Sequence, residues 1–340
     1  MRPPILTLTT DFGASDHYVG AMKGVILGIC PQARIVDICH DVTPFQIAEG
    51  AYVIAQAYDC FPKKTVHVVV VDPGVGTARR PILVEAAGQY FVGPDNGVLS
   101  MAYSRGKHKV RLIANDRYFR QPVSATFHGR DIFAPVAAHV AAGVPPSRVG
   151  KPIEDYLWPE FAKPQRSGER TWSGSILKID RFGNVVTNFH VRDFPDLYPA
   201  GHALEPADRA LDLASRVLEP HGRAPHTQSR AREQADDSFA SGQRPLPHGL
   251  GSVAMAREQA DDSFASGQRP LPYGRGSLAV AVTAGRRKIA TLARNYAESR
   301  PGALFLIVGS SGYLEVSVNQ GSAAKLMGCK TGDPVKLTLE

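Results

Sequence analysis

The chain has 340 residues, of which 43% are hydrophobic and 21% are charged, so most of it can bury a core and wholesale disorder is excluded. At about 100–200 residues per domain, this length predicts about two domains. The formal net charge is +7, but the basic residues are scattered singly or in short pairs such as Lys63-Lys64. That distribution is typical of a solvated surface, so we expect no nucleic-acid partner.

Targeting signals and cysteine pairs are both missing from the sequence pattern. No run approaches the ~18 apolar residues of a membrane span, and the apolar stretch near the N-terminus is too short for a signal peptide. We therefore expect a cytoplasmic protein with no membrane partner. The four cysteines form no Cys-x-x-Cys pair, which favours reduced, buried thiols over a disulfide framework or a metal site.

The first 150 residues alternate between strand and helix patterns. Apolar residues at helical spacing run from Tyr18 to Ile29, and the valine-rich run 66–71 is typical of a strand covered on both faces. Strands alternating with helices predict an α/β domain, which we place at residues 1–165. The full set of expected elements is strand 5–9, helix 18–29, strand 34–39, helix 47–59, strand 66–71, a hairpin of 82–85 with 90–92, and helix 132–142.

The pattern changes after Trp172, where short strand-like segments alternate with glycine-rich turns. This predicts a smaller, mostly β domain over residues 166–340, joined to the first through the proline- and glycine-containing stretch 159–168. The expected strands are 175–180, 185–189, 278–282, 304–308, 313–318 and 334–339.

One segment fits neither domain. Residues 231–247 recur identically as residues 256–272, and no lysine occurs between Lys178 and Lys288. Two identical copies are unlike a solenoid, whose repeats keep only their packing positions. We interpret residues 203–277 as an insertion into the second domain, either a mobile loop or an interaction arm.

Polar residues follow several predicted strands of the first domain. Asp11 follows the first strand, Asp72 follows the valine-rich strand, and Asp95 follows the hairpin. Strand carboxyl ends are where open α/β sheets bind ligands, although any one of these residues alone is also typical of a turn or a helix cap. His128 lies beside a glycine before a predicted helix, where it is either a capping or core residue or a base.

Seven segments carry a more specific signal when they are taken together and in order. They cover residues 1–195 and 278–340, and they are T-T-D-F-G-x-x-D-x-Y-V-G-x-M-K-G (9–24), D-V-T-P (41–44), V-D-P-G-V-G-T-x-R-R (71–80), G-P-D-N-G (93–97), F-H-G-R-D (127–131), D-x-F-G-N-V-V-T-N (180–188) and G-S-S-G-Y-L-E-V-x-V-N-x-G-S-A-A (309–324). The chain thereby resembles the S-adenosylmethionine hydrolases, also called S-adenosylmethionine hydroxide adenosyltransferases, which are relatives of fluorinase and chlorinase.

The resemblance implies an α/β N-terminal domain, a barrel-like β C-terminal domain, and a homotrimer whose sites lie between subunits. It places the catalytic triad on Asp72, Arg79 and His128. In the halogenating relatives the aspartate and histidine are replaced, so their presence favours water as the nucleophile. The implied substrate contacts are Asp11 with the ribose hydroxyls, Phe45 and Phe182 with the nucleoside, Asn184 with adenine, Asp180 and Ser310 with the methionine end, and Glu315 with the adenosine side.

The implied reaction is hydrolysis of S-adenosyl-L-methionine to adenosine and L-methionine by attack at ribose C5′. The leaving group is a sulfonium that departs as a neutral thioether, so the reaction needs no general acid, metal or cofactor. We expect Asp72 and His128 to orient and deprotonate the water. Arg79 would keep Asp72 ionised and stabilise hydroxide character.

Three other functions remain open from the sequence. The first is a halide-dependent 5′-halo-5′-deoxyadenosine synthase of the same superfamily. The second is a metal-dependent phosphohydrolase, for which the ligands would be Asp11, Asp16, Asp72, Asp95 and His128. The third is a non-catalytic nucleoside or S-adenosylmethionine binder, because the insertion interrupts the domain expected to face a neighbouring subunit.

Overall fold

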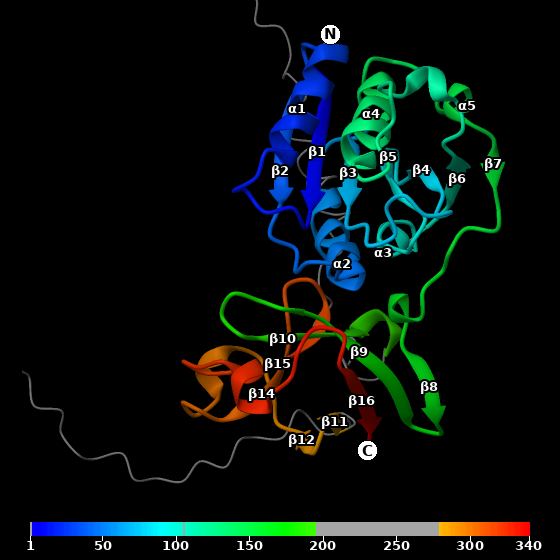
Figure 1. The fold of residues 1–340 in the computed structure, drawn as a ribbon. Helices are drawn as coiled ribbons and strands as arrows, with labels where there is room; N and C mark the ends of the chain where they lie inside the picture. Colours follow the sequence, from blue (N-terminus) through cyan, green and yellow to red (C-terminus); the bar gives the residue numbers. More distant parts are fainter. Residues whose placement is uncertain (1, 105, 195–278) are drawn as a thin grey trace, which may run out of the picture. The chain divides into compact units, whose positions relative to one another are not determined.

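The computed structural model describes residues 2–104, 106–194 and 279–340. Its strands form two sheets, one of seven strands early in the chain and one of nine strands later (Figure 1). The predicted insertion at 203–277 lies outside the described residues. No helix within the described residues has the length and apolar character needed to cross a membrane.

The first sheet is mixed and has the strand order β2-β1-β3-β5-β4-β6-β7. The strands from β2 to β5 in this order run parallel, and each later neighbour pairs antiparallel. The parallel strands bring their carboxyl ends to one edge, which is where the polar residues follow. The strands are β1 Ile5–Thr10, β2 Arg34–Cys39, β3 Val66–Val70, β4 Pro81–Ala86, β5 Gln89–Pro94, β6 His108–Leu112 and β7 Pro152–Ile153.

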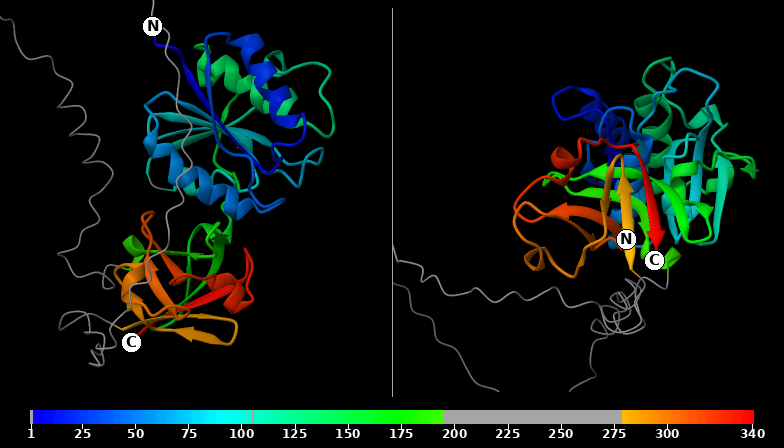
Figure 2. Two further views of the ribbon diagram at one scale, coloured as in Figure 1. Left: turned by 90° about the vertical axis from the view of Figure 1, so that its left-hand side faces the viewer. Right: turned by 90° about the horizontal axis from the view of Figure 1, so that it is seen from below.

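Helices cover both faces of this sheet (Figure 2). Helices α1 (Tyr18–Ile29) and α4 (Ala134–Ala141) pack in one core with Val68, and α2 (Ile47–Ala57) and α3 (Ser100–Tyr103) pack in the other with Val69. Successive residues of a strand point to opposite faces, so a strand between two apolar layers needs apolar side chains throughout. The valine-rich pattern therefore predicted this strand correctly.

Every element predicted for the first 150 residues is observed, but strands β6 and β7 and helix α3 were not predicted, and some helix ends differ. Helix α1 has the predicted bounds, whereas α2 ends at Ala57 and is followed by the 3-10 turn Tyr58–Cys60. The last helix was predicted to begin at residue 132, but α4 begins at Ala134, because the π-helical turn Gly129–Phe133 precedes it. A further short helix, α5 (Pro146–Val149), follows α4.

The second sheet has the order β12-β11-β16-β9-β10-β15-β14-β13, and β8 also pairs with β9. Its neighbours are antiparallel except for β13 with β14. The part of the chain after residue 165 is thus mostly strands, as predicted, with the short helix α7 (Ala323–Met327). The strands are β8 Gln165–Gly168, β9 Thr171–Ile179, β10 Val185–His190, β11 Val280–Ala284, β12 Arg287–Ile289, β13 Leu292–Ala293, β14 Leu304–Val308, β15 Tyr313–Val318 and β16 Pro334–Leu339.

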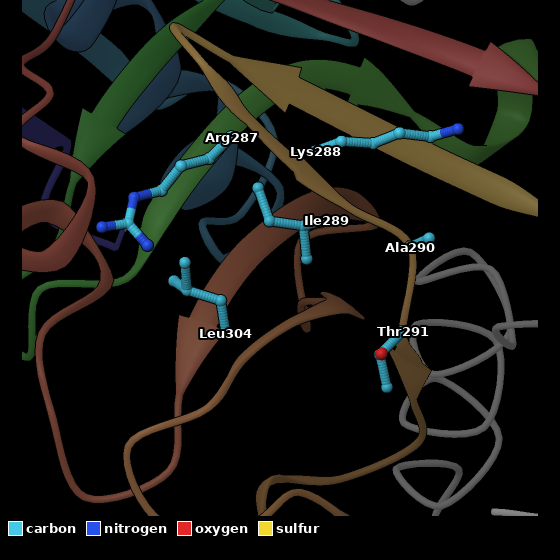
Figure 3. Close-up of a pocket in the computed structure, with 6 residues that line it drawn as sticks. All are labelled: Arg287, Lys288, Ile289, Ala290, Thr291 and Leu304. Carbon is cyan, nitrogen blue, oxygen red and sulfur yellow. The ribbon is translucent and has the colours of Figure 1, made fainter.

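The barrel expected for this region is formed only in part. The sheet curls, so that residues of β12 and β14 line one pocket (Figure 3). The two ends of the strand order, β12 and β13, are not paired with each other. The expected connector 159–168 is also more regular than predicted, because it contains the 3-10 turn Glu160–Ala162 and strand β8.

Candidate active site

Two loops of the first sheet bring Asp72, Arg79 and His128 together. Asp72 follows β3, Arg79 ends the glycine-containing loop after it, and His128 directly precedes the π-helical turn. The Arg79 Nε donates to both Asp72 carboxylate oxygens at 3.0 Å, and its Nη2 donates to Asp72 Oδ2 as well. The same Nη2 lies 2.9 Å from His128 Nδ1. Three side chains that are distant in sequence thus form one hydrogen-bonded unit.

This geometry fixes the tautomer of His128. A guanidinium can only donate, so His128 Nδ1 must accept from Arg79 and the ring proton of the neutral form lies on Nε2. Burial and the neighbouring Arg79 charge lower the pKa of His128, which is therefore neutral at pH 7. The unit presents an Nε2–H donor beside the Asp72 carboxylate.

Arg79 is itself almost fully enclosed. Its side chain is 9% exposed, and its Cζ lies 5.1 Å from the centroid of the Phe133 ring. Its buried Nη1 has no hydrogen-bond partner among the described residues. An unpaired buried donor is costly, so a small polar ligand or water at this position would stabilise the site.

Gly76 lets the Asp72 and His128 loops approach each other. It has φ +77°, and a Cβ at this position would lie 2.4 Å from the Ala125 carbonyl oxygen. Both the conformation and the contact require glycine. The close approach places Arg79, three residues later, within reach of His128.

Asp131 holds the loop that carries His128, and the sequence analysis did not select it. The Asp131 carboxylate is fully buried and accepts from Ser124 N at 2.9 Å and from Arg130 Nε at 2.7 Å. Burial alone raises the pKa of Asp131, but hydrogen bonds from Arg130 and Ser124 lower it overall. The signal was present in the segment F-H-G-R-D, in which a carboxylate follows His128 by three residues.

Asp11 lies at the end of β1, near the triad. Its Oδ2 accepts from Phe45 N at 2.9 Å, and Phe45 has φ +68° and a side chain that is 69% exposed. Burial raises the pKa of Asp11, and the nearby charge of Asp72 adds to the effect. Asp11, Phe45 and the triad therefore belong to one neighbourhood at the carboxyl edge of the sheet.

A second hydrogen-bond network, centred on His40, holds the residues on either side of Asp11. Thr10 Oγ1 lies 2.9 Å from His40 Nδ1, and His40 Nε2 lies 3.1 Å from Asp37 Oδ1. The His40 carbonyl oxygen accepts from Gly13 N at 2.8 Å. His40 therefore ties the residues on both sides of Asp11 to the segment that leads to Phe45.

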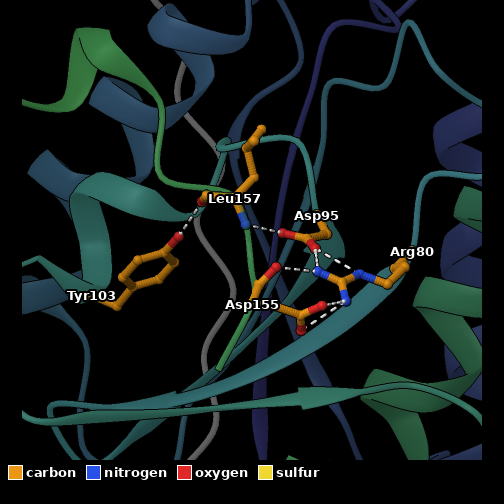
Figure 4. Close-up of polar contacts among 5 residues, drawn as sticks. All are labelled: Arg80, Asp95, Tyr103, Asp155 and Leu157. Atoms are coloured by element: carbon orange, nitrogen blue, oxygen red, sulfur yellow. Dashed lines mark hydrogen bonds and ion pairs between the residues drawn. The ribbon is translucent and has the colours of Figure 1, made fainter. Parts of the chain in front are cut away.

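Asp95, which the sequence suggested as a site residue, has a structural partner instead. Arg80 donates to Asp95 from Nε and Nη2, at 3.0 and 2.7 Å, and to Asp155 from Nη1 at 2.9 Å (Figure 4). Asp95 Oδ1 also accepts from Leu157 N, whose carbonyl accepts from the Tyr103 hydroxyl. Of the two adjacent arginines, Arg79 therefore contacts Asp72 and His128, and Arg80 joins Asp95 to Asp155 in the segment before the connector.

A second group of predicted site residues lies in the turn after β9. Asp180 Oδ1 accepts from Phe182 N and Asn184 N, and its Oδ2 accepts from Asn184 Nδ2, all at 2.9 Å. Asn184 Nδ2 also lies 3.3 Å from the Tyr296 hydroxyl. The Phe182 side chain is 79% exposed. Asp180 thus organises a turn that presents an aromatic ring to solvent.

Glu315 and Ser310 belong to the same group. Ser310 is exposed in the turn between β14 and β15, and Glu315 lies on β15 with 8% exposure. Burial and the neighbouring Asp180 charge raise the pKa of Glu315 to about 7. Among the residues that the structure describes, no hydrogen bond or ion pair joins this second group to the triad and Asp11.

Neither a metal site nor the pocket beside β12 coincides with the predicted site residues. No group of three or more His, Cys, Asp or Glu side chains within them is placed to hold a metal ion. A pocket of about 230 Å³ lies beside β12, and it is lined by Arg287, Lys288, Ile289, Ala290, Thr291 and Leu304 (Figure 3). None of the predicted site residues lines it, so we place the site at the triad and not in this pocket.

Comparison with known families gives two matches along the chain. The SAM hydroxide adenosyltransferase N-terminal domain matches residues 6–150, and the C-terminal domain of the same family matches residues 271–336. An (R)-S-adenosyl-L-methionine hydrolase from Salinispora tropica is 30% identical over 98% of this chain and 98% of its own length. Its counterpart from Methanocaldococcus jannaschii is 42% identical over 54% of this chain and 66% of its own length.

Other relatives include fluorinases and structures without a stated activity. A fluorinase from an Actinoplanes species is 32% identical over 56% of this chain and 73% of its own length. The crystal structure of an uncharacterized conserved protein from Thermotoga maritima superimposes with a TM-score of 0.65 at 31% identity. That match covers 98% of this chain and 99% of the other.

Proposed function

The chain belongs to the SAM hydroxide adenosyltransferase family, and on that premise we propose that it hydrolyses S-adenosyl-L-methionine to adenosine and L-methionine. The single observation that carries the mechanism is the hydrogen-bonded unit of Asp72, Arg79 and His128. It combines an anionic acceptor, a fixed cation and a neutral imidazole that donates from Nε2. Such a set suits a bound water better than a halide ion, because the carboxylate repels an anion and accepts a proton.

The chemical step then follows from these roles. Water donates one hydrogen bond to Asp72 and accepts another from His128 Nε2–H, which aims its free lone pair. The oxygen bonds to ribose C5′ while the C5′–S bond breaks and its electron pair stays on sulfur, giving the neutral thioether of methionine. The surplus water proton passes to Asp72 and then to solvent. Positioning of this kind lowers a barrier by several kcal/mol, with ~7–11 as the upper range.

The other predicted residues would hold the two ends of the substrate. Asp11 suits a ribose diol, because a carboxylate accepts from two hydroxyl groups. The exposed rings of Phe45 and Phe182 would stack on the nucleoside. Both Nδ2 hydrogens of Asn184 already have partners, which leaves its carbonyl oxygen to accept from the adenine amino group. Asp180 and Ser310 would face the methionine end.

We also propose a homotrimer in which each site is shared between subunits. The observation in its favour is that the triad group and the Asp180 group share no hydrogen bond or ion pair within the described part of one chain. A complete site would then combine the first sheet of one subunit with the second sheet of the next. Sedimentation velocity of the full chain tests the assembly, and a monomer with full activity would contradict it.

Chromatography of products after incubation with S-adenosyl-L-methionine in halide-free buffer tests the function. We expect adenosine and methionine in equal amounts, and loss of both with Asp72→Ala or His128→Ala while substrate still binds. Full turnover in both variants would refute the assignment. Formation of 5′-chloro- or 5′-fluoro-5′-deoxyadenosine with added halide would favour the halide-dependent alternative, and binding without product would favour the non-catalytic one.

A further inference from the structure

A buried ion pair joins helix α2 to strand β9, and the mechanism above does not use it. Lys178 Nζ lies 2.6 Å from Glu49 Oε1, and the two side chains are 23% and 4% exposed. A buried carboxylate is costly unless it is paired and hydrogen-bonded, so the position of Glu49 depends on Lys178.

The second carboxylate oxygen of Glu49 holds the loop that precedes α2. Glu49 is the third residue of the helix, and its Oε2 accepts from Thr43 N at 3.3 Å. The N-cap residue, Gln46, makes no side-chain cap of its own. A glutamate at the third position that reaches back to a backbone N–H fixes how the chain enters the helix.

Phe45 lies in this loop, and its backbone needs support from its surroundings. It has φ +68°, a region that residues with a Cβ adopt only where neighbouring groups hold them there. Its N–H donates to Asp11 Oδ2 at 2.9 Å, and Gln46 N closes the turn by donating to the Thr43 carbonyl oxygen at 3.0 Å. The contact from Glu49 to Thr43 N therefore fixes one end of the turn that presents the exposed Phe45 ring.

A β-bulge in the second sheet aims Lys178 at the same helix. The pairing of β9 with β10 shifts register at this point and leaves Leu177 as an extra residue of β9. Strict alternation would direct Leu177 and Lys178 to opposite faces of the sheet. Instead, Leu177 packs in one apolar cluster with Ala51 of α2, and Lys178 reaches Glu49 of α2. Bulges re-aim side chains in this way, so the sheet is shaped to bring a cation to Glu49.

Resting on the proposed function, we propose that Glu49 and Lys178 are a positioning pair, which holds the Phe45 loop in the conformation that binds the nucleoside. Lys178 fixes the Glu49 carboxylate, and Glu49 in turn fixes the backbone of Thr43. The turn that starts there presents the Phe45 ring and places the N–H that holds Asp11. A loop that is held in advance need not be ordered on binding, so the contribution of the pair appears in affinity.

Calorimetry with adenosine and the KM for S-adenosyl-L-methionine measure this contribution. Lys178→Met keeps the apolar stem and removes the cation. The loss of a hydrogen bond to a charged group corresponds to roughly a 10- to 150-fold change in affinity, and only part of that loss reaches the loop. We therefore expect adenosine affinity to fall and KM to rise about tenfold, with kcat within about twofold of the wild type. Lys178→Arg keeps the cation and should recover most of the affinity.

A double-mutant cycle separates positioning from a general loss of stability. If the pair acts through the loop, Lys178→Met changes adenosine affinity by less than about twofold once Phe45→Ala has removed the ring. A general loss of stability would weaken binding equally in both backgrounds. Should Lys178→Met fail to fold, Glu49→Gln supplies the same cycle, because the amide keeps the shape of the side chain and removes its charge. It should weaken adenosine binding only where the Phe45 ring is present.

Arg111→Met is the matched control, since it removes the cation of another enclosed ion pair. Arg111 is 10% exposed and donates from Nε to Glu85 Oε1 at 2.8 Å, which joins β6 to β4. Neither strand carries a predicted site residue. We expect a lower melting temperature in this variant, with adenosine affinity within about twofold of the wild type.

Unchanged adenosine affinity in Lys178→Met, or equal weakening with and without the Phe45 ring, would overturn the role of the pair. These outcomes leave the proposed function intact, because wild-type turnover is measured separately. Absence of turnover in a wild type that binds adenosine would overturn the proposed function alone. Absence of both turnover and adenosine binding would overturn the proposed function and this role together.

Discussion

The triad group of the first sheet and Glu315 of the second sheet differ in their side-chain contacts. In the first sheet, Asp72, Arg79 and His128 hydrogen-bond to one another, and Asp11 is held by Phe45 N. In the second sheet, Glu315 is buried without a partner inside the described part of the chain. The side chains of the first group fix one another, apart from Arg79 Nη1, whereas the Glu315 carboxylate has no hydrogen bond or ion pair among the described residues.

We infer that the first group orients the reacting water and that the second group helps to hold the substrate. A site that must orient one small molecule, water, benefits from side chains that are already fixed. A site that must select a large cationic ligand benefits from a charge that only the correct ligand neutralises.

Removing the negative charge of the triad should have the largest effect. We expect Asp72→Asn to lower turnover by about 10²–10⁴-fold, because Arg79 loses its ionic partner and water loses its proton acceptor. The control is Asp155→Asn, which removes an exposed carboxylate from neighbouring Arg80 and should leave turnover within about twofold. Similar losses in both variants, measured as kcat from adenosine formation, would contradict the distinction between the two arginines.

The interior of the first sheet should make the fold sensitive to acid. His67 in β3 is fully buried, lies 2.7 Å from Thr7 Oγ1 and 3.3 Å from Gln89 Oε1, and has a pKa lowered to about 4 by burial. A histidine with a depressed folded-state pKa stabilises the fold fully above its unfolded value of 6.5. The contribution, about 3 kcal/mol, is lost as the pH falls from 6.5 to 4.

Urea unfolding between pH 7 and pH 4 measures this loss. We expect the free energy of unfolding to fall less steeply with acid in His67→Gln than in the wild type, because glutamine does not titrate. The same slope in both proteins would show that His67 is not the group responsible.

Removing the His40 side chain, which holds the residues beside Asp11, should have a smaller effect that is confined to substrate binding. In His40→Ala the hydrogen bond to Thr10 is lost, at a cost of about 1 kcal/mol, so we expect KM for S-adenosyl-L-methionine to rise about fivefold with kcat nearly unchanged. Asparagine can replace the ring nitrogen, so His40→Asn should recover part of the affinity. A fall in kcat with unchanged KM would place His40 in the chemical step instead.

The effect of Arg79 on its neighbour is expected to be the smallest of these. Burial and then the charge of Arg79 lower the pKa of His128, so Arg79→Gln should raise that pKa towards its ordinary value without exceeding it by much. Titration of the His128 ring by NMR measures the shift. Because the pKa of His128 is lowered in the wild type, its ring stays neutral when the pH falls just below 6.5, and we expect activity to persist at that pH.

Much of the fold was predictable because its signals are local. The helix Tyr18–Ile29 and the strand Val66–Val70 followed from apolar spacing alone. Helix ends were less predictable, because the π-helical turn before α4 contains Asp131, whose buried carboxylate contacts Ser124 and Arg120, and these contacts leave no mark in the apolar spacing. The incomplete closing of the second sheet likewise depends on how distant strands meet.

The sequence predicted which residues form the site, but it did not predict all of their hydrogen-bond partners. The strand-end positions and the seven segments selected Asp72, Arg79 and His128, and the resemblance chose Arg79 over its neighbour, whereas the contacts of Arg80 were not predicted. The same limit explains Asp95, which follows a strand as a ligand-binding residue would and is instead held by Arg80. The isolation of Glu315 was equally hidden, because a missing partner is a property of three-dimensional packing.

Hydrolysis in ¹⁸O-labelled water shows whether water supplies the oxygen atom that bonds to ribose C5′. If the triad directs water to ribose C5′, the adenosine formed from S-adenosyl-L-methionine in halide-free buffer carries one ¹⁸O atom at its 5′ position, the methionine carries none, and Asp72→Asn forms neither product at a comparable rate. Unlabelled adenosine, or label in a product of Asp72→Asn at the wild-type rate, would contradict the account.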